Sequence, residues 1–274
     1  MSVHPRISVS AVSSWNNTFD EDIELWAAVG IDRVGLSLAK LLAAGVERSA
    51  TRVRDAGLTV TNVVAAGGFM LDDESSWLAG RARLEDAIHA CVTVSAGCLV
   101  VTTGRAAPMT WEDAASRFAD AMAPVLQSAR SADVKVALEH TNPFRTDVSF
   151  VHTLRDALDL AERMDIGVCV ETNACWAERD IDTTLATGIP HIALVQVSDH
   201  AIGTLRSADR LVPGDGDIPL GRLVGALGSA GYTGAYDIEL IGPHIEAEGY
   251  RSAITRSLAA VENLIDGGGR DPTP

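Results

Sequence analysis

The chain is 274 residues long, with 47% hydrophobic residues, 22% charged residues and a formal net charge of -15. These proportions are ordinary for a globular protein with a substantial core. The acidic balance argues against nucleic acid as a partner, because affinity for a polyanion comes largely from basic residues. The amino terminus, MSVHPRISVS, lacks the pattern of a signal peptide, and we see no apolar run of about 18 residues, so we expect a cytoplasmic protein without membrane association.

Short apolar runs rich in β-branched residues alternate with amphipathic stretches along the whole chain. Strands are predicted at residues 7–12, 33–38, 58–65, 98–103, 134–140, 166–172, 192–198 and 236–241. A helix is predicted after each strand, at residues 20–29, 40–56, 76–95, 111–131, 150–163, 178–187, 219–230 and 249–265. Gly57, Gly97 and Gly231 stand between a helix and the next strand, where we expect a left-handed residue. The chain therefore repeats one strand and helix unit eight times.

Such a repeat predicts the α/β class, either as an open doubly wound sheet or as a closed barrel. The open sheet should carry a glycine-rich phosphate loop after its first strand, whereas here the sequence SSWNNTFDED follows. We therefore predict a single-domain (β/α)8 TIM barrel over residues 1–266. The remaining tail, GGGRDPTP at 267–274, is expected to be disordered.

Each of the four later strands ends in polar residues. The active site of such a barrel lies at the carboxyl ends of its strands. Strand alternation predicts that Glu139, Glu171, Gln196 and Glu239 all point toward the barrel axis. Carboxylates buried together need a positive partner. A divalent metal held by these four residues is the economical choice, and their oxygen atoms suit Mn or Mg best, with Co or Zn as further candidates. The alternatives are a buried salt bridge for the glutamates and an internal hydrogen bond for Gln196.

Several other residues at this end of the barrel are candidates for contact with a small-molecule substrate. They flank the proposed ligands or lie in the loops that follow them: His140, Asn142, Asn173, Trp176, His200 and Arg210. Arg145 is a weaker candidate than Arg210 for holding a substrate oxygen or phosphate. Trp15 and Phe69, together with Trp176, are expected to wall the pocket.

The latter half of the chain resembles one known family of barrels. The stretches ALEHTNP, ALDLAERMDIGVCVET, LVQVSDH, RLVPGDGDIPL and AGYTGAYDIEL are similar, in order and spacing, to the strand-five to strand-eight blocks of the xylose isomerase-like TIM barrel family, the sugar phosphate isomerases and epimerases. The resemblance implies one divalent metal on Glu139, Glu171, Gln196 and Glu239. It also implies that Glu139 and Glu239 act as the acid/base pair that removes and returns a proton beside a carbonyl.

Three positions depart from the family pattern. Glu171 stands where the family has Asp, and Ala174 and Gln196 stand where it has His. An amide is a weaker ligand than imidazole for most transition metals. The departures therefore bear on both metal binding and substrate.

The resemblance and the paired glutamates together predict a metal-dependent isomerase or epimerase that acts on a sugar or another polyhydroxylated or cyclic ketone. Two alternatives stay open. A lyase, such as a dehydratase or an enzyme that cleaves a C–C or C–O bond, would begin with the same enolate, and a metal-free barrel could serve as a binding or accessory protein. Because barrels of this family often pair, a homodimer is expected.

Overall fold

The computed structural model describes residues 3–65, 68–206 and 208–267. Eight parallel strands close into a barrel in the order β1-β10-β9-β8-β7-β5-β3-β2, and β1 pairs with β2 to complete the ring. These strands are β1 (Ile7–Ser10), β2 (Arg33–Ser37), β3 (Thr59–Ala65), β5 (Leu99–Val101), β7 (Val136–Glu139), β8 (Gly167–Glu171), β9 (Ile192–Val197) and β10 (Tyr236–Ile238). The predicted (β/α)8 barrel is confirmed. The predicted tail lies outside the described residues beyond Gly267.

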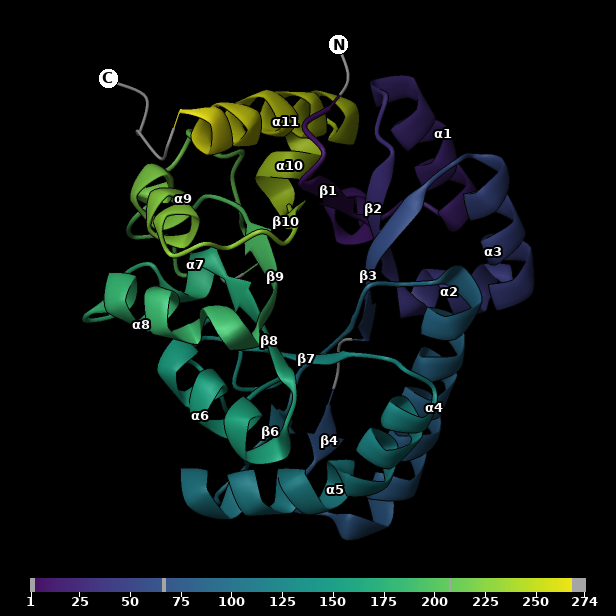
Figure 1. Ribbon diagram of the computed structural model, residues 1–274, viewed down its shortest axis with the longest axis vertical. Coiled ribbons are helices and arrows are strands. Elements are labelled where there is room, and N and C mark those ends of the chain that lie inside the picture. Colours follow the sequence, from purple (N-terminus) through teal and green to yellow (C-terminus); the bar gives the residue numbers. More distant parts are fainter. Residues whose placement is uncertain (1–2, 66–67, 207, 268–274) are drawn as a thin grey trace.

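Helices form an outer ring around the barrel (Figure 1). They are α1 (Phe19–Val29), α2 (Leu38–Ala44), α3 (Val46–Asp55), α4 (Trp77–Val94), α5 (Trp111–Ser131), α6 (Leu154–Met164), α7 (Thr172–Cys175), α8 (Ile181–Gly188), α9 (Leu220–Ser229), α10 (Pro243–Glu248) and α11 (Tyr250–Asp266). The helix predicted at 40–56 is two helices, because Gly45 has a φ of 87° and interrupts it. No helix among the described residues is both long and apolar enough to cross a membrane.

Side-chain caps decide where several helices begin. Thr18 accepts a hydrogen bond from the Glu21 N–H, while the Glu21 carboxylate accepts from the Thr18 N–H, which is a capping box. Thr153 accepts from the Asp156 N–H, so α6 begins at Leu154 rather than at residue 150 as predicted. These caps satisfy main-chain N–H groups that have no partner within the helix.

The left-handed residues between helices and strands are partly where the sequence predicts them. Gly57 and Gly231 have φ values of 67° and 89°. The prediction for Gly97 is wrong, because Ser95 takes the left-handed conformation instead, with φ 56°. Gly97 is needed for a close approach, since a Cβ atom there would lie 2.6 Å from the Thr61 main-chain oxygen.

Strand alternation separates two apolar layers. Leu99, Leu138 and Val195 belong to the large core between the strands and the helices. Residues of the same strands, including Val100, Ala137 and Leu194, belong to a second cluster that fills the inside of the barrel. The barrel interior is therefore packed, and a site can form only above this layer, at the carboxyl ends of the strands.

A two-stranded sheet of β4 (Phe69–Met70) and β6 (Gly104–Arg105) lies outside the barrel sheet. Gly104 allows the close pairing, since a Cβ atom there would lie 2.0 Å from the Phe69 main-chain oxygen. The Phe69 side chain is 3% exposed and packs edge-on against Phe118. The prediction that Phe69 walls the pocket is therefore wrong, because its ring belongs to the core.

Candidate active site

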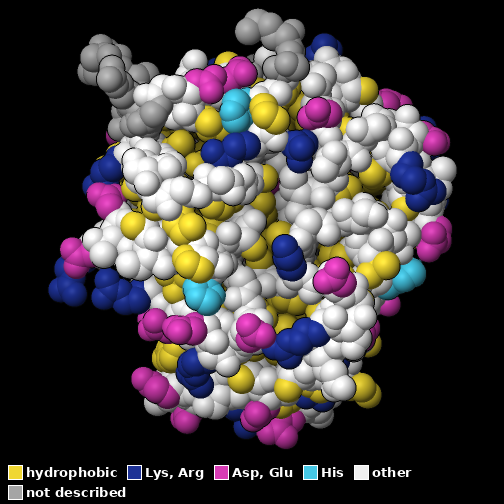
Figure 2. All heavy atoms as spheres, in the orientation of Figure 1, with side chains coloured by type: hydrophobic (Ala, Val, Ile, Leu, Met, Phe, Trp, Pro, Cys, Tyr) yellow, Lys and Arg dark blue, Asp and Glu magenta, His cyan; other side chains and the backbone are white. Residues whose placement is uncertain are grey.

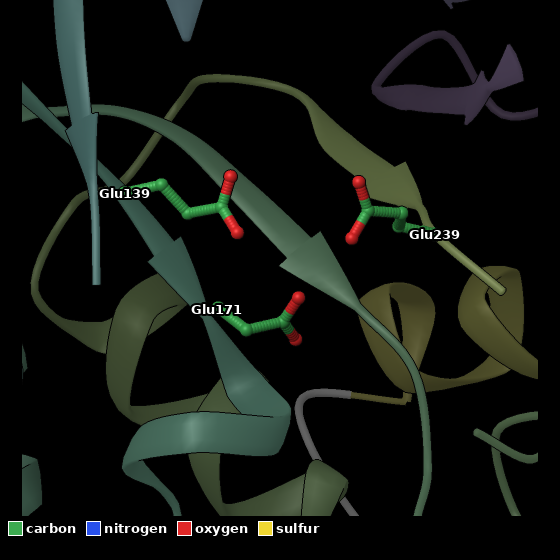
Figure 3. Close-up of side chains that lie close together, drawn as sticks. All are labelled: Glu139, Glu171 and Glu239. Carbon is green, nitrogen blue, oxygen red and sulfur yellow. The ribbon is translucent and has the colours of Figure 1, made fainter. Parts of the chain in front are cut away.

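Three glutamates meet at the carboxyl ends of the later strands. Glu139 ends β7, Glu171 ends β8, and Glu239 directly follows β10. One carboxylate oxygen of each lies within 4.8 Å of the other two, and all three residues are buried. Glu139 and Glu239 point toward one another, and Glu171 points into the space between them (Figure 3). We call these three residues the carboxylate triad, and their direction is the one that strand alternation predicts.

Arg210 places a guanidinium nitrogen between two members of the triad. Its Nη1 atom lies 2.7 Å from Glu171 Oε2 and 2.5 Å from Glu239 Oε2. The same nitrogen donates to the Glu239 main-chain oxygen at 3.0 Å. The sequence predicts a positive partner for these carboxylates and assigns Arg210 to the substrate. In the structure, Arg210 itself is a positive partner of the triad.

The main chain around Arg210 is fixed by the loop that follows β9. The Arg210 N–H donates to the Ile241 oxygen at 2.9 Å, and Leu211 forms an antiparallel bridge with Asp199. The Asp199 carboxylate accepts hydrogen bonds from four main-chain N–H groups, those of His200, Gly214, Gly216 and Ile218. Asp199 thus organises the turn that positions Arg210.

Gln196 lies beside Glu239 inside the barrel and is fully buried. Its Nε2 donates to Glu239 Oε1 at 2.9 Å, and its Oε1 accepts from the Cys169 thiol at 3.3 Å. A metal would bind the amide oxygen, whereas here that oxygen accepts from Cys169 and the amide nitrogen faces the triad. The structure thus gives Gln196 the internal hydrogen bond that was the alternative to its predicted role as a ligand.

Two members of the triad, Glu139 and Glu171, bind protons more readily than ordinary carboxylates do. Burial raises the pKa of Glu139 well above its usual range, and the carboxylates of Glu239 and Glu171 raise it further. Burial also raises the pKa of Glu171 to about 7, although the charge of Arg210 opposes the shift. Groups that titrate near neutral pH are suited to acid/base chemistry.

Three of the predicted substrate contacts lie away from the cavity wall. His140 is fully buried, and its Nε2 accepts a hydrogen bond from the Glu171 N–H at 3.1 Å. Burial lowers the pKa of His140 to about 3, so the ring is neutral and holds the main chain of β8. The His200 main-chain N–H donates to the Asp199 carboxylate, and Trp176 is half-buried against the core. None of these three side chains lines the cavity over the triad.

The cavity over the triad has a volume of about 160 Å³. The predicted residues Asn142, Asn173, Arg210 and Trp15 line it together with the triad. Sequence reasoning did not identify the rest of the wall, which comes from separate parts of the chain: Val12, Val64, Thr102, Thr141, Val148, Ala208 and Ile241, with Arg145 considered only as a weaker candidate. Part of the cavity wall is therefore apolar.

A larger cavity of about 830 Å³ lies between the loop that carries Val212 and Pro213 and the helix α11. Its wall contains Arg256 and Asp215 lies close by, but these two side chains are paired with each other. The carboxylate triad lines the smaller cavity. We therefore place the candidate active site there, where titratable groups converge.

The donors of the triad fit a divalent cation. Three carboxylates that converge within 4.8 Å supply only oxygen, the ligand that Mg and Mn prefer. Glu139, Glu171 and Glu239 would hold such an ion.

Acidic and basic side chains are interspersed over the face of the molecule shown in Figure 2. On this face, basic side chains have acidic side chains among their neighbours.

Comparison with known proteins gives one family and many similar structures. A family model described as the xylose isomerase-like TIM barrel matches residues 21–260. A protein from Sinorhizobium meliloti 1021 is 23% identical, with a TM-score of 0.86 over 95% of this chain and 98% of that chain. No curated protein sequence is significantly similar to the chain.

Two further solved structures are similar to the chain. The IolI protein, solved with a zinc atom, is 18% identical, with a TM-score of 0.84 over 96% of this chain and 98% of that chain. An L-ribulose 3-epimerase is 17% identical, with a TM-score of 0.78 over 98% of this chain and 96% of that chain. At these identities the likeness shows the shared fold.

Proposed function

The chain belongs to the xylose isomerase-like TIM barrel family, and on that basis we propose that the protein is an isomerase or epimerase that exchanges a proton on the carbon next to a carbonyl. The observation that carries the proposal is the facing pair of carboxylates on Glu139 and Glu239 at the mouth of the barrel (Figure 3). Two such groups on opposite sides of one carbon can remove a proton from one face and return a proton to the other. The L-ribulose 3-epimerase of similar fold supports this class of reaction.

The two glutamates have different surroundings, which suggests their roles. Glu239 accepts hydrogen bonds from Gln196 and Arg210, so it is the proton-accepting member of the pair. Its carboxylate takes the proton from the carbon, and the electrons of the broken C–H bond form the enolate. Glu139, protonated, gives its proton to the opposite face of the same carbon. The stereocentre is inverted and the substrate keeps its mass, and the reverse reaction uses the pair with exchanged roles.

The three glutamates of the triad would also hold a divalent cation, Mn or Mg, which when bound would polarise the substrate carbonyl. Within the protein, Gln196 keeps the Glu239 carboxylate in place, and His140 fixes the β8 main chain at Glu171. Holding both carboxylates against the reacting carbon is the main contribution that the fold makes to the rate.

The cavity supports a proposal about the class of substrate. Its volume of about 160 Å³ is below the roughly 300–1,000 Å³ typical of pockets for drug-sized ligands, so the substrate is a small molecule. One wall is acidic, whereas Val12, Trp15, Val148 and Ile241 form apolar surface. We propose a ketose or a cyclic ketone that has one apolar face.

A panel of ketoses and cyclic ketones, assayed with Mn²⁺ in excess of the enzyme, tests the proposal. We expect product of unchanged mass, and a loss of roughly 10²- to 10⁴-fold in turnover for both Glu139→Gln and Glu239→Gln. Glu85→Gln, an exposed glutamate on α4, is the matched control and should keep full activity. Full turnover in both active-site variants would refute the acid/base pair, and a product that has lost water would identify a dehydratase instead.

A further inference from the structure

Two members of the carboxylate triad already have partners on both carboxylate oxygens. Glu239 Oε1 accepts from Gln196 Nε2 at 2.9 Å, and Glu239 Oε2 lies 2.5 Å from Arg210 Nη1. Glu171 Oε1 accepts from the Asn173 N–H at 3.0 Å, and Glu171 Oε2 lies 2.7 Å from the same Arg210 nitrogen. Arg210 Nη1 thus bridges one oxygen of each glutamate.

A divalent ion would need these same oxygens. Mg²⁺ or Mn²⁺ bound to carboxylate oxygens lies roughly 2.0–2.2 Å from them. Because Arg210 Nη1 contacts the two Oε2 atoms at 2.5 and 2.7 Å, an ion bound to both would lie in contact with a guanidinium of the same sign. Two cations in contact within a buried site repel strongly.

Arg210 contacts the triad end-on, through one nitrogen. A single nitrogen makes both ion pairs, whereas a fork of two nitrogens would hold a carboxylate more firmly. Arg210 Nε is buried and has no hydrogen-bond partner among the described residues. The side chain also lines the cavity, so the guanidinium can swing into that space while the main chain stays bound to Ile241.

We propose that Arg210 is the resident cation of the carboxylate triad and that a divalent ion binds there only after the guanidinium has left. The inference rests on the proposed function, because it concerns the metal that the triad would hold. It makes metal affinity a property set by Arg210 as well as by the ligands. An arginine that competes for the ligands lowers the apparent affinity, and its removal raises it.

Titration of Mn²⁺ by isothermal calorimetry, without substrate, tests this inference. Arg210→Gln should bind Mn²⁺ roughly 10- to 100-fold more tightly than the wild-type protein. Arg222→Gln is the matched control, because Arg222 pairs with Asp182 at 3.0 Å on the surface and does not line the cavity. Its affinity should stay within about threefold of the wild-type value.

The proposal is overturned if Arg210→Gln binds Mn²⁺ no more tightly than Arg222→Gln, or if neither variant binds it. Should Arg210→Gln fail to fold, crystals of the wild-type protein soaked in Mn²⁺ decide the question. We expect Mn²⁺ on the triad with Arg210 turned away, and a bound ion with Arg210 still between Glu171 and Glu239 would refute the competition. The Mn²⁺ titration does not measure proton exchange. Failure of this inference can therefore be told apart from failure of the proposed reaction.

Discussion

Replacing Arg210 by glutamine should destabilise the protein, because it removes a positive charge from among buried carboxylates. The Arg210 side chain is 12% exposed and contacts Glu171 and Glu239 at 2.7 and 2.5 Å. Breaking a buried ion pair by removing one partner costs about 3–5 kcal/mol, since the remaining charge stays buried. At roughly 2–4 °C per kcal/mol for a chain of this size, the Tm should fall by roughly 6–20 °C.

The assay is thermal unfolding at pH 7.5 in metal-free buffer, followed by circular dichroism. The control is Arg222→Gln, because Arg222 pairs with Asp182 at 3.0 Å but both side chains are half exposed. An exposed pair contributes about 0–1 kcal/mol, so this variant should unfold within about 4 °C of the wild-type protein. Equal Tm values for the two variants would show that Arg210 does not stabilise the triad.

Three further changes test other parts of the structure. Asp199→Ala leaves four main-chain N–H groups without their shared acceptor. We expect the free energy of unfolding in urea to fall by about 2–4 kcal/mol and hydrogen exchange over residues 213–218 to become faster. Unchanged exchange in this segment would contradict the role of Asp199. Burial raises the pKa of Asp22 to about 6, above its ordinary 3.8. The protonated carboxyl therefore contributes fully to the free energy of unfolding below about pH 4, and about 3 kcal/mol of this contribution is lost as the pH rises through 6. Asp22→Asn should lack this loss, so the difference in unfolding free energy between the two proteins should shift by that amount between pH 4 and pH 7; a constant difference would be the contrary result. Gln196→His replaces the amide beside Glu239 with an imidazole ligand and should raise Zn²⁺ affinity on the order of tenfold in calorimetry; an unchanged Kd would argue against a metal at the triad.

The barrel could be predicted from the sequence because its signal repeats along the whole chain. Each of the eight strands is an apolar run, and each is followed by a helix-forming stretch. Short elements carry too few residues for a period to appear, which is why β4, β6, α7 and α10 were not predicted. The break at Gly45 was missed because the hydrophobic pattern continues across it, while the φ of 87° depends on how α2 turns into α3.

The direction of the triad could be predicted, but its partners could not. Alternation along a strand is a local rule, and it places Glu139, Glu171 and Glu239 inside the barrel. Arg210 reaches Glu239 from a loop whose path depends on hydrogen bonds to Asp199, and its sequence reads only as a turn. The apolar wall of the cavity could not be predicted for the same reason, because its residues come from separate parts of the chain that the closed barrel brings together.

The most direct test of proton exchange is deuterium incorporation during turnover in D2O. With an active ketose or cyclic ketone, we predict one deuterium on the carbon next to the carbonyl of the product, seen by mass spectrometry and NMR, and loss of this exchange in Glu239→Gln. Product formed at full rate without deuterium would contradict the reaction proposed for Glu139 and Glu239.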